Sequence, residues 1–507
     1  MAISYRRLNN EYSDVEQQNE VCALSNTETP SIWHTGIHRP SNGNGSTRWL
    51  DRARFALLGF ALFFLLNQLE FVNFGVFNLR SGFLKLTNGE PLKKIPTKQI
   101  LLFRRRPEVA SVDCARVISG DVNYTEKFSK GRIPLIPNPN LDMSCSGIRD
   151  RVLMGRSEQE KINYSIAFAR DVHEAYEYLE MQLAASYSFE NHYCYSTDSK
   201  APRDFQQKIR MLAACLPNVY TPPEKNVMDS AGHNINRGHY DCMTVLIEQP
   251  DWKYLVLQQT FDVVLHTHRE MAEMFKLIEG TNDVEIVEGV PWGRINKELD
   301  WSLPGLGFIT NNTMMSQEEV SKAKISFGKG YVQASLMRAA VKWITKEVNV
   351  EKLITQFNGK PSDYGVDEQF IATLQVSETL RMPGGFHHTC AGRTNDWYMT
   401  RYTIWGGECK TNNWRHGQCV FGIEDAPSLT NKTAKRFLMG NKFVPDFDFA
   451  GYSCINEWVF NKTRDGDQPF DADHIIKNPQ ARYNREKLAG RIDIYTYNCS
   501  DIPKGKK

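Results

Sequence analysis

The stretch Tyr164–Ser199 has the sequence YSIAFARDVHEAYEYLEMQLAASYSFENHYCYSTDS, and its pattern decides the fold class. It opens on a short apolar run, Tyr164–Ala169, and ends in a second one, His192–Thr197. Between the two runs, apolar residues recur at helical spacing over Val172–Ser186. A strand, a helix and another strand in this order predict a βαβ unit, in which the two strands pair in parallel.

The same alternation continues along the chain. Short apolar or β-branched runs at Asn218–Tyr220 and Tyr254–Gln259 predict two more strands. Helical patterns over Phe205–Cys215 and His239–Glu248 lie between the runs. We therefore expect an α/β domain built around a mainly parallel sheet.

Two acidic residues each follow an expected strand. They are Asp198 and Asp262. In parallel sheets the ligand crevice lies beyond the carboxyl ends of the strands, so both side chains are candidates to face it. Each residue is equally suited to cap the next helix, and the pattern leaves this alternative open.

The N-terminal part of the chain predicts a membrane anchor. Residues 1–54 are polar and lack periodicity, which is typical of a disordered tail. An apolar stretch over 55–79 is long enough to span a bilayer, although Glu70 is costly in hydrocarbon. Arginines just before this stretch favour a cytoplasmic tail, as in a single-pass type II protein. The alternatives are a buried core helix or the apolar part of a signal peptide.

Cysteines and sequons agree with a lumenal location for the rest of the chain. Only Cys22 precedes the apolar stretch, and ten cysteines follow it, an even number that fits an oxidising compartment. Six N-glycosylation sequons lie on the same side. They are Asn123, Asn163, Asn311, Asn431, Asn461 and Asn498.

Composition divides the lumenal part into three. Residues 80–140 contain proline-punctuated segments and are expected to form a stem, 141–460 carry the α/β pattern, and 461–507 form a C-terminal extension. Lys and Arg number 61 against 59 Asp and Glu, so no nucleic-acid partner is indicated.

A series of short motifs occurs in a fixed order between Cys145 and Trp458. They are YSIAF, NHYCYSTDSKA, DCMTVL, DWKYL, PGGF, CVFG and GNKF. In order and spacing they resemble the core-2/I-branching β-1,6-N-acetylglucosaminyltransferases, glycosyltransferase family 14. The resemblance implies a GT-A-like, Rossmann-type nucleotide-sugar-binding domain on a type II anchor in the Golgi membrane, and hexosyltransferase activity with a UDP-sugar donor.

The segment Gly365–Leu374, GVDEQFIATL, resembles the family segment that carries the catalytic glutamate. That position is Glu368 here. An inverting transfer needs a base to accept the proton of the attacking hydroxyl. A carboxylate in the first turn of a helix is favoured by the helix dipole and suits this role. Taken alone, it would be an ordinary glutamate at a helix N-terminus.

The departing UDP gains charge as its bond to the sugar breaks, so the site needs a cation. By resemblance, this task falls to Arg415 in NWRHGQCVFG and Lys442 in GNKF. Asp198 would then contact the uridine or the ribose. As isolated residues, the two cations would be ordinary surface charges.

No metal cofactor is expected. Three Asp-x-Asp segments, at 446–448, 465–467 and 471–473, lie far towards the C-terminus, and none follows a nucleotide-binding strand. His387, His388 and Cys390 form a ligand-like cluster but have no second ligand pair at metal spacing.

The resemblance also implies an acceptor contact and a set of disulfides. Trp405 matches a family tryptophan near the acceptor sugar, although a buried core tryptophan is an equally good interpretation. Residues 280–325, where further acceptor contacts are expected, do not match. The implied pairs are Cys194–Cys242, Cys145–Cys215, Cys409–Cys419 and Cys114–Cys454, which leave Cys390 and Cys499 free or bonded to each other.

Together these features predict an inverting transferase that moves N-acetylglucosamine from UDP-GlcNAc in β-1,6 linkage onto O-glycan-type acceptors. UDP-xylose and UDP-glucose are alternative donors. The alternative from another class is a catalytically silent lumenal glycan-binding protein.

Overall fold

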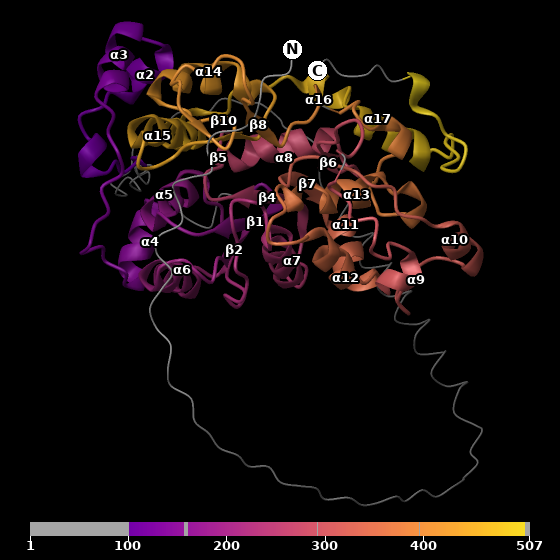
Figure 1. Ribbon diagram of the computed structural model, residues 1–507. Coiled ribbons are helices and arrows are strands. Elements are labelled where there is room, and N and C mark those ends of the chain that lie inside the picture. Colours follow the sequence, from indigo (N-terminus) through magenta and orange to yellow (C-terminus); the bar gives the residue numbers. More distant parts are fainter. Residues whose placement is uncertain (1–100, 157–160, 292, 395, 502–507) are drawn as a thin grey trace, which may run out of the picture. The chain divides into compact units, whose positions relative to one another are not determined.

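The computed structural model describes residues 101–156, 161–291, 293–394 and 396–501 (Figure 1). The expected tail at 1–54 and anchor at 55–79 lie outside these residues. Within the described ranges, no helix is both long enough and apolar enough to cross a membrane.

A six-stranded sheet forms the centre of the fold. Its strand order is β3-β2-β1-β4-β7-β6, with the first four strands parallel and the last two antiparallel to their neighbours. The strands are β1 (Ser165–Val172), β2 (His192–Thr197), β3 (Val219–Tyr220), β4 (Trp252–Gln259), β6 (Asp283–Val284) and β7 (Ala334–Met337). The expected α/β class and mainly parallel sheet are confirmed.

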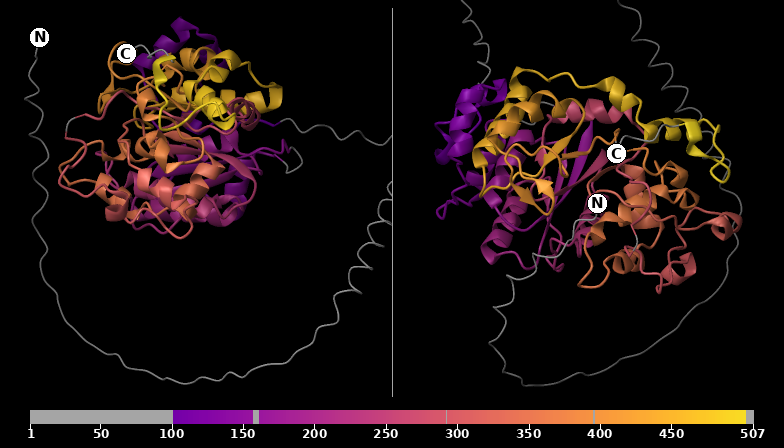
Figure 2. Two further views of the ribbon diagram at one scale, coloured as in Figure 1. Left: turned by 90° about the vertical axis from the view of Figure 1, so that its right-hand side faces the viewer. Right: turned by 45° about the horizontal axis from the view of Figure 1, so that its top comes forward.

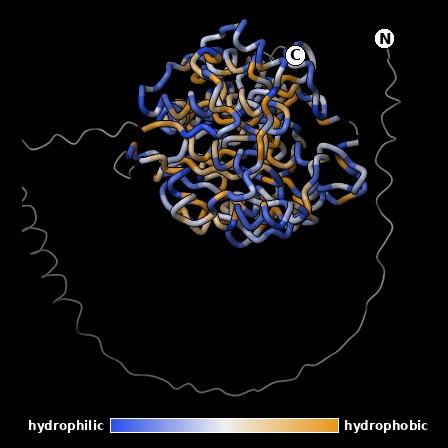
Figure 3. The backbone as a smooth tube through the Cα atoms, turned by 90° about the vertical axis from the view of Figure 1, so that its left-hand side faces the viewer, coloured by the Kyte–Doolittle hydropathy of each residue, from blue (hydrophilic) through white to orange (hydrophobic). Residues whose placement is uncertain are grey.

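Helices cover both faces of this sheet, and alternate residues of each strand enter two separate cores. Ile166 and Phe168 of β1 enter one core, and Ala167 and Ala169 enter the other. The first core is covered by α4 (Cys145–Leu153), α5 (Tyr176–Ser186), α6 (Arg203–Cys215), α8 (His268–Leu277) and α15 (Phe449–Asp465). The second is covered by α7 (Ile235–Leu246), α11 (Arg338–Lys342), α12 (Glu351–Phe357) and α13 (Phe370–Val376). Figure 3 shows hydrophilic segments along much of the periphery, with apolar segments running inside.

A second, smaller sheet stands beside the first and carries residues of the site. It contains β5 (Val263–Val264), β11 (Met439–Asn441) and β8 (Arg401–Thr403), with β11 in the middle. A short hairpin of β9 (Trp414–Arg415) and β10 (Gln418–Cys419) follows β8 in the chain.

The first helix begins later than its periodicity predicts. Strand β1 continues to Val172, which pairs with Thr197, the last residue of β2. Helix α5 begins only at Tyr176. Ten consecutive residues of α5, from Tyr176 to Ala185, are buried. Because sheet pairing determines where β1 ends, apolar spacing alone could not place this boundary.

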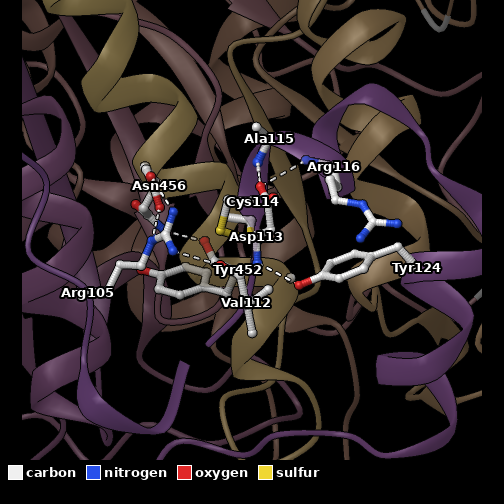
Figure 4. Close-up of a disulfide and its surroundings, with 12 residues drawn as sticks. Arg105, Val112, Asp113, Cys114, Ala115, Arg116, Tyr124, Tyr452 and Asn456 are labelled. Atoms are coloured by element: carbon white, nitrogen blue, oxygen red, sulfur yellow. Dashed lines mark hydrogen bonds and ion pairs between the residues drawn. A yellow bond between two sulfur atoms is a disulfide. The ribbon is translucent and has the colours of Figure 1, made fainter. Parts of the chain in front are cut away.

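Most of the described part of the expected stem is folded. It forms α2 (Cys114–Ser119) and α3 (Val122–Lys130), and Val109, Val112 and Val117 are buried in the first core. Figure 4 shows the surroundings of the disulfide that joins Cys114 to Cys454 of α15, where the Arg105 guanidinium donates a hydrogen bond to the Val112 carbonyl. The expected boundary at residue 140 therefore falls inside the folded unit.

The expected boundary at residue 460 also falls inside the folded unit. Helix α15 runs through it without a break and ends at Asp465. Beyond it, α17 (Pro479–Leu488) buries Ala481 in the first core and Tyr483 in the second. The described residues between 101 and 501 belong to one compact unit, so the C-terminal segment up to Asp501 is an integral part of the domain (Figure 2).

Five disulfides connect the described residues. Four are the pairs that the resemblance implies, Cys114–Cys454, Cys145–Cys215, Cys194–Cys242 and Cys409–Cys419. The fifth joins the two cysteines whose state was left open, Cys390 and Cys499. A native disulfide of this kind typically contributes about 2–5 kcal/mol to stability.

Candidate active site

A cavity of about 230 Å³ lies at the carboxyl edge of the central sheet. Its lining includes Asp171 at the end of β1, Asp198 directly after β2, and Gln259 at the end of β4. Strand β1 lies between β2 and β4, where the strand order reverses and α/β sheets bind their ligands.

All five residues with implied catalytic, donor or acceptor roles line this one cavity. They are Asp198, Glu368, Trp405, Arg415 and Lys442. Their chemical roles stay predictions, but the fold brings them together from separate parts of the chain.

The backbone holds the Asp198 carboxylate in place. Its Oδ1 accepts hydrogen bonds from the N–H groups of Lys200 at 3.0 Å and Met228 at 3.1 Å. No described residue donates a hydrogen bond to Oδ2, so this oxygen can accept one from a ligand. Asp198 lies in the loop before α6, whose N-terminal cap is Pro202, so it is not the cap of that helix.

Asp262 does not face the cavity, and both interpretations of this residue were wrong. Its carboxylate is buried and accepts from the Gln259 N–H at 2.6 Å and the Asn441 side-chain amide at 2.9 Å. The cap of α8 is Thr267. Asp262 instead connects the turn after β4 to β11.

Asp171 is a further acidic residue that lines the cavity, and the sequence analysis did not identify it as a candidate. Its side chain is buried, and neither carboxylate oxygen has a well-aligned hydrogen bond from a described residue. Burial raises its pKa well above the usual range, and the nearby Asp367 adds to the effect.

Glu368 is the last residue of a short 3-10 helix, Val366–Glu368, and lies just before α13 rather than inside a first α-helical turn. Its Oε2 lies 3.0 Å from the Lys329 ammonium, although the two are not aligned for a hydrogen bond, and 3.4 Å from the Arg294 guanidinium. No described residue donates to its Oε1. The side chain is 21% exposed, so an acceptor hydroxyl can reach the free oxygen.

Steric contacts explain why the GVDEQF segment has a glycine at position 365. Gly365 has a φ of +65°, and a Cβ there would come within 2.1 Å of a guanidinium nitrogen of Arg294. Arg294 donates a hydrogen bond to the Gly365 carbonyl at 2.6 Å. The glycine therefore lets Arg294 lie beside Glu368.

Two further carboxyl groups near Glu368 titrate near neutral pH. Burial raises the pKa of Asp367, which lines the cavity, to about 7, and the charge of Glu368 adds to this effect. Burial also raises the pKa of Glu285 to about 7, against the opposing influence of Lys329. Protonation in this part of the site therefore changes within the physiological range.

The two implied diphosphate ligands share one aromatic neighbour. The guanidinium carbon of Arg415 lies 5.0 Å from the centre of the Phe261 ring, and the Lys442 ammonium lies 5.9 Å from it. Burial, together with the positive charges of Arg401 and Arg415, lowers the pKa of Lys442 to about 8. Burial of like charges close together costs free energy, and an anionic ligand bound between Arg401, Arg415 and Lys442 would reduce this cost.

Trp405 is 47% exposed at the cavity and not part of the core. Its indole N–H donates to the Tyr331 hydroxyl at 2.8 Å, and the two rings are nearly parallel, with centres 6.3 Å apart. The pair offers an aromatic face to a sugar ring.

Arg401 is the main residue at the cavity that the sequence analysis missed. It lies on β8, four positions before Trp405, and is buried. Its Nε donates to the Thr403 hydroxyl at 2.7 Å, and its Nη1 donates to the Gln333 side chain. Nothing in TRYTIW distinguishes a buried arginine from a solvated one, because the neighbours that bury it come from other segments.

The three Asp-x-Asp segments do not line the cavity. Asp448 instead caps α15 and pairs with Arg132, and Asp471 caps α16 (Ala472–Ile476). The histidine cluster was expected to include Cys390, but Cys390 is bonded to Cys499. His387 and His388 lie with Glu378, which the sequence did not connect to them, and the potential ligand atoms of the three lie within 4.8 Å of one another.

The implied glycosylation sites are compatible with modification. Five of the six asparagines are exposed, and Asn461 is partly buried. The exposed ones are Asn123, Asn163, Asn311, Asn431 and Asn498.

The fold and cavity define an α/β protein with a group of cationic side chains and a nearby carboxylate at the carboxyl edge of its sheet. Residues 166–430 match the family described as Core-2/I-Branching enzyme. The chain belongs to this family, and it is a glycosyltransferase.

Curated relatives extend the similarity beyond the family match. The chain is 24% identical over 387 residues to the mouse (Mus musculus) protein named beta-1,3-galactosyl-O-glycosyl-glycoprotein beta-1,6-N-acetylglucosaminyltransferase 3, covering 70% of this chain and 84% of the relative. It is also 24% identical over 408 residues to the human (Homo sapiens) protein named beta-1,3-galactosyl-O-glycosyl-glycoprotein beta-1,6-N-acetylglucosaminyltransferase, covering 72% and 92%.

Proposed function

We propose that this glycosyltransferase moves N-acetylglucosamine from UDP-GlcNAc, with inversion, onto a 6-hydroxyl of an O-glycan-type acceptor. The observation that carries the proposal is the common cavity, which presents the carboxylate of Glu368 and the cations Arg415 and Lys442. The names of the relatives suggest the donor and the linkage.

In the proposed reaction the acceptor hydroxyl attacks the anomeric carbon of the donor sugar. Glu368 accepts the hydroxyl proton through its free Oε1. The bond from the anomeric carbon to the diphosphate oxygen breaks, and its electron pair leaves with UDP. Arg415 and Lys442 stabilise the charge that develops on the diphosphate, so a divalent metal is not required. Asp198 accepts a hydrogen bond from the nucleoside through its free Oδ2.

On the acceptor side, the Trp405 and Tyr331 rings hold the sugar beside Glu368. Trp405 is exposed at the cavity, Tyr331 is partly buried there, and one hydrogen bond joins the two side chains. Stacking against an aromatic face orients a pyranose without fixing its identity. The acceptor is therefore proposed only as a class of glycan.

The remaining proposals concern topology. Residues 1–54 form a cytoplasmic tail, 55–79 anchor the protein in the Golgi membrane, and the catalytic domain is lumenal. Support comes from the apolar stretch, the upstream arginines, the exposed sequons and the five disulfides, which need an oxidising compartment.

The test is a UDP-release assay with UDP-GlcNAc, UDP-xylose and UDP-glucose, each with and without a galactosyl-N-acetylgalactosamine acceptor. We expect acceptor-dependent release with UDP-GlcNAc and analysis of the product to give a β-1,6 linkage. Faster transfer from UDP-xylose or UDP-glucose would show that UDP-GlcNAc is not the preferred donor. Binding of the acceptor without release of UDP from any of the three donors would favour a catalytically silent glycan-binding protein.

A further inference from the structure

Three cationic side chains line the cavity without an ion pair to a carboxylate among the described residues. They are Arg401, Arg415 and Lys442. The other two cations near the base, Arg294 and Lys329, both lie within ion-pair distance of Glu368. The proposed function uses only two of the three unpaired cations, and Arg401 is left without a role.

The Arg401 guanidinium is held rigidly and only partly satisfied. Its Nε and Nη1 donate to Thr403 and Gln333, and its central carbon lies 4.8 Å from the centre of the Tyr331 ring. Its Nη2 is buried and has no hydrogen-bond acceptor among the described residues. Since a buried donor without an acceptor costs free energy, this nitrogen is suited to a ligand that brings one.

Arg401 lies close enough to Lys442, one of the two residues expected to bind the diphosphate, for their charges to interact. Among the neighbouring charges that act on Lys442, Arg401 lowers its pKa most, ahead of Arg415. Strand pairing explains this proximity, because β8 and β11 are parallel neighbours with Thr403 opposite Asn441, the residue before Lys442.

The charge on the nucleotide changes during the reaction. In a UDP-sugar each of the two phosphates carries one negative charge, which two cations balance. Once the sugar has left, the terminal phosphate can ionise a second time, with a pKa of about 6, so released UDP carries nearly one more charge. A third cation has its greatest effect on the leaving group and on the transition state that resembles it.

We propose that Arg401 is a catalytic residue whose Nη2 donates to the departing diphosphate while the bond to the sugar breaks. The inference rests on the proposed function and adds a residue to the same site. In this step the electron pair of the breaking bond passes to the diphosphate oxygen, the acceptor proton passes to Glu368, and Arg401 exchanges no proton. Arg401 therefore discriminates between UDP and UDP-sugar, whereas Arg415 and Lys442 bind both.

The experiment compares the affinities of UDP and UDP-GlcNAc, without acceptor, for the wild type, Arg401→Met and Arg401→Lys. Calorimetry gives both affinities, and turnover with acceptor gives kcat. For Arg401→Met we expect UDP affinity and kcat to fall by about 10- to 100-fold, and UDP-GlcNAc affinity by less than about threefold. Arg401→Lys keeps the charge and should retain most of the preference for UDP.

The matched control is Arg338→Met. Arg338 is half-buried and donates to the carbonyls of Gln249 and Ile247, away from the cavity, so both affinities should stay at wild-type values. If Arg401→Met does not fold, Arg401→Gln, which can still bond to Thr403 and Gln333, replaces it.

Equal loss of UDP and UDP-GlcNAc affinity in the Arg401 variants would overturn the inference, because a structural clamp predicts that result. Unchanged UDP affinity would overturn it as well. Failure of the wild type to bind UDP at all would refute the proposed function instead, so the two failures are distinguishable.

Discussion

The Lys329 ammonium lies 3.0 Å from Oε2 of Glu368, and no described residue donates to the other oxygen of this carboxylate. The two oxygens therefore have different environments. One lies beside cations that fix the side chain, and the other is left to accept a proton from a substrate.

This asymmetry makes Glu368→Gln an informative variant. The amide keeps the size of the side chain but cannot accept the proton, so we expect kcat to fall about 10²–10⁴-fold. UDP affinity should change little, because the cations are untouched. Steady-state kinetics and calorimetry on the same preparation check both values, and activity within a few-fold of wild type would exclude Glu368 as the base.

Transfer should not require a divalent metal. We expect activity to persist in excess EDTA, and Arg415→Ala and Lys442→Ala each to weaken UDP binding by about 10-fold or more. Exposed Lys435→Ala serves as a charge-matched control. If EDTA abolished activity and manganese restored it, the assignment of the two cations would have to be given up.

UDP binding should weaken at alkaline pH. The pKa of Lys442 is lowered to about 8 by burial and by Arg401 and Arg415. Below this pH the ammonium is charged and ready to bind the diphosphate, whereas above it binding must first restore the proton. We expect the affinity to fall by up to about tenfold per pH unit above pH 8.

Calorimetry at pH 7 and pH 9 measures this dependence. Lys442→Arg is the control, because its guanidinium stays charged throughout and the slope should become shallower. An unchanged slope in this variant would show that another group titrates.

Three buried carboxyl groups near the cavity should stabilise the folded domain more at mildly acidic pH than at pH 8. The pKa values of Asp367 and Glu285 are raised to about 7, and that of Asp171 is raised well above its usual range, in each case mainly by burial. These groups keep their protons in the folded protein after the unfolded chain has lost them near pH 4. The contribution of Asp367 and Glu285 is complete below about pH 4 and is lost as the pH rises through about 7.

Several buried or partly buried histidines have lowered pKa values and contribute with the opposite sign, so the test compares variants and not the wild type alone. The change in Tm between pH 5.5 and pH 8 is measured for the wild type and for Asp367→Asn, and removal of this titrating group should shift the change upwards by about a few °C. Asp446→Asn, at an exposed position, should leave the change at its wild-type value. An equal change in Asp367→Asn and the wild type contradicts the prediction.

The aromatic pair should affect the acceptor and not the donor. Trp405→Ala removes the exposed face, and we expect the KM for the acceptor to rise about 2- to 10-fold with the KM for the donor unchanged. Tyr331→Phe removes only the hydroxyl that fixes the indole, so its effect should be smaller. A change confined to the KM for the donor would place Trp405 on the nucleotide side.

The sequence was sufficient to predict the four parallel strands of the central sheet, because each is a short apolar run between helical patterns, and β2 begins and ends where its run does. It did not predict the antiparallel strands β6 and β7 or the short strands outside the central sheet. It also marked the glutamate and the two cations through their motifs. It could not predict Arg401 or Asp171, whose burial depends on segments distant in the chain. The end of the stem was misplaced for a similar reason, since α2 is held in the core by Cys454, far away in the sequence.

The bond between Cys114 and Cys454 also determines what a protease can release. If residues 55–79 anchor the protein as proposed, a cut before residue 101 frees the whole described domain with every described core residue in place. A cut within the exposed part of 131–140 severs the chain, but α2 remains covalently attached to α15. Shedding into solution as an intact enzyme is therefore limited to cleavage upstream of Leu101, and a nick further along becomes visible only after reduction.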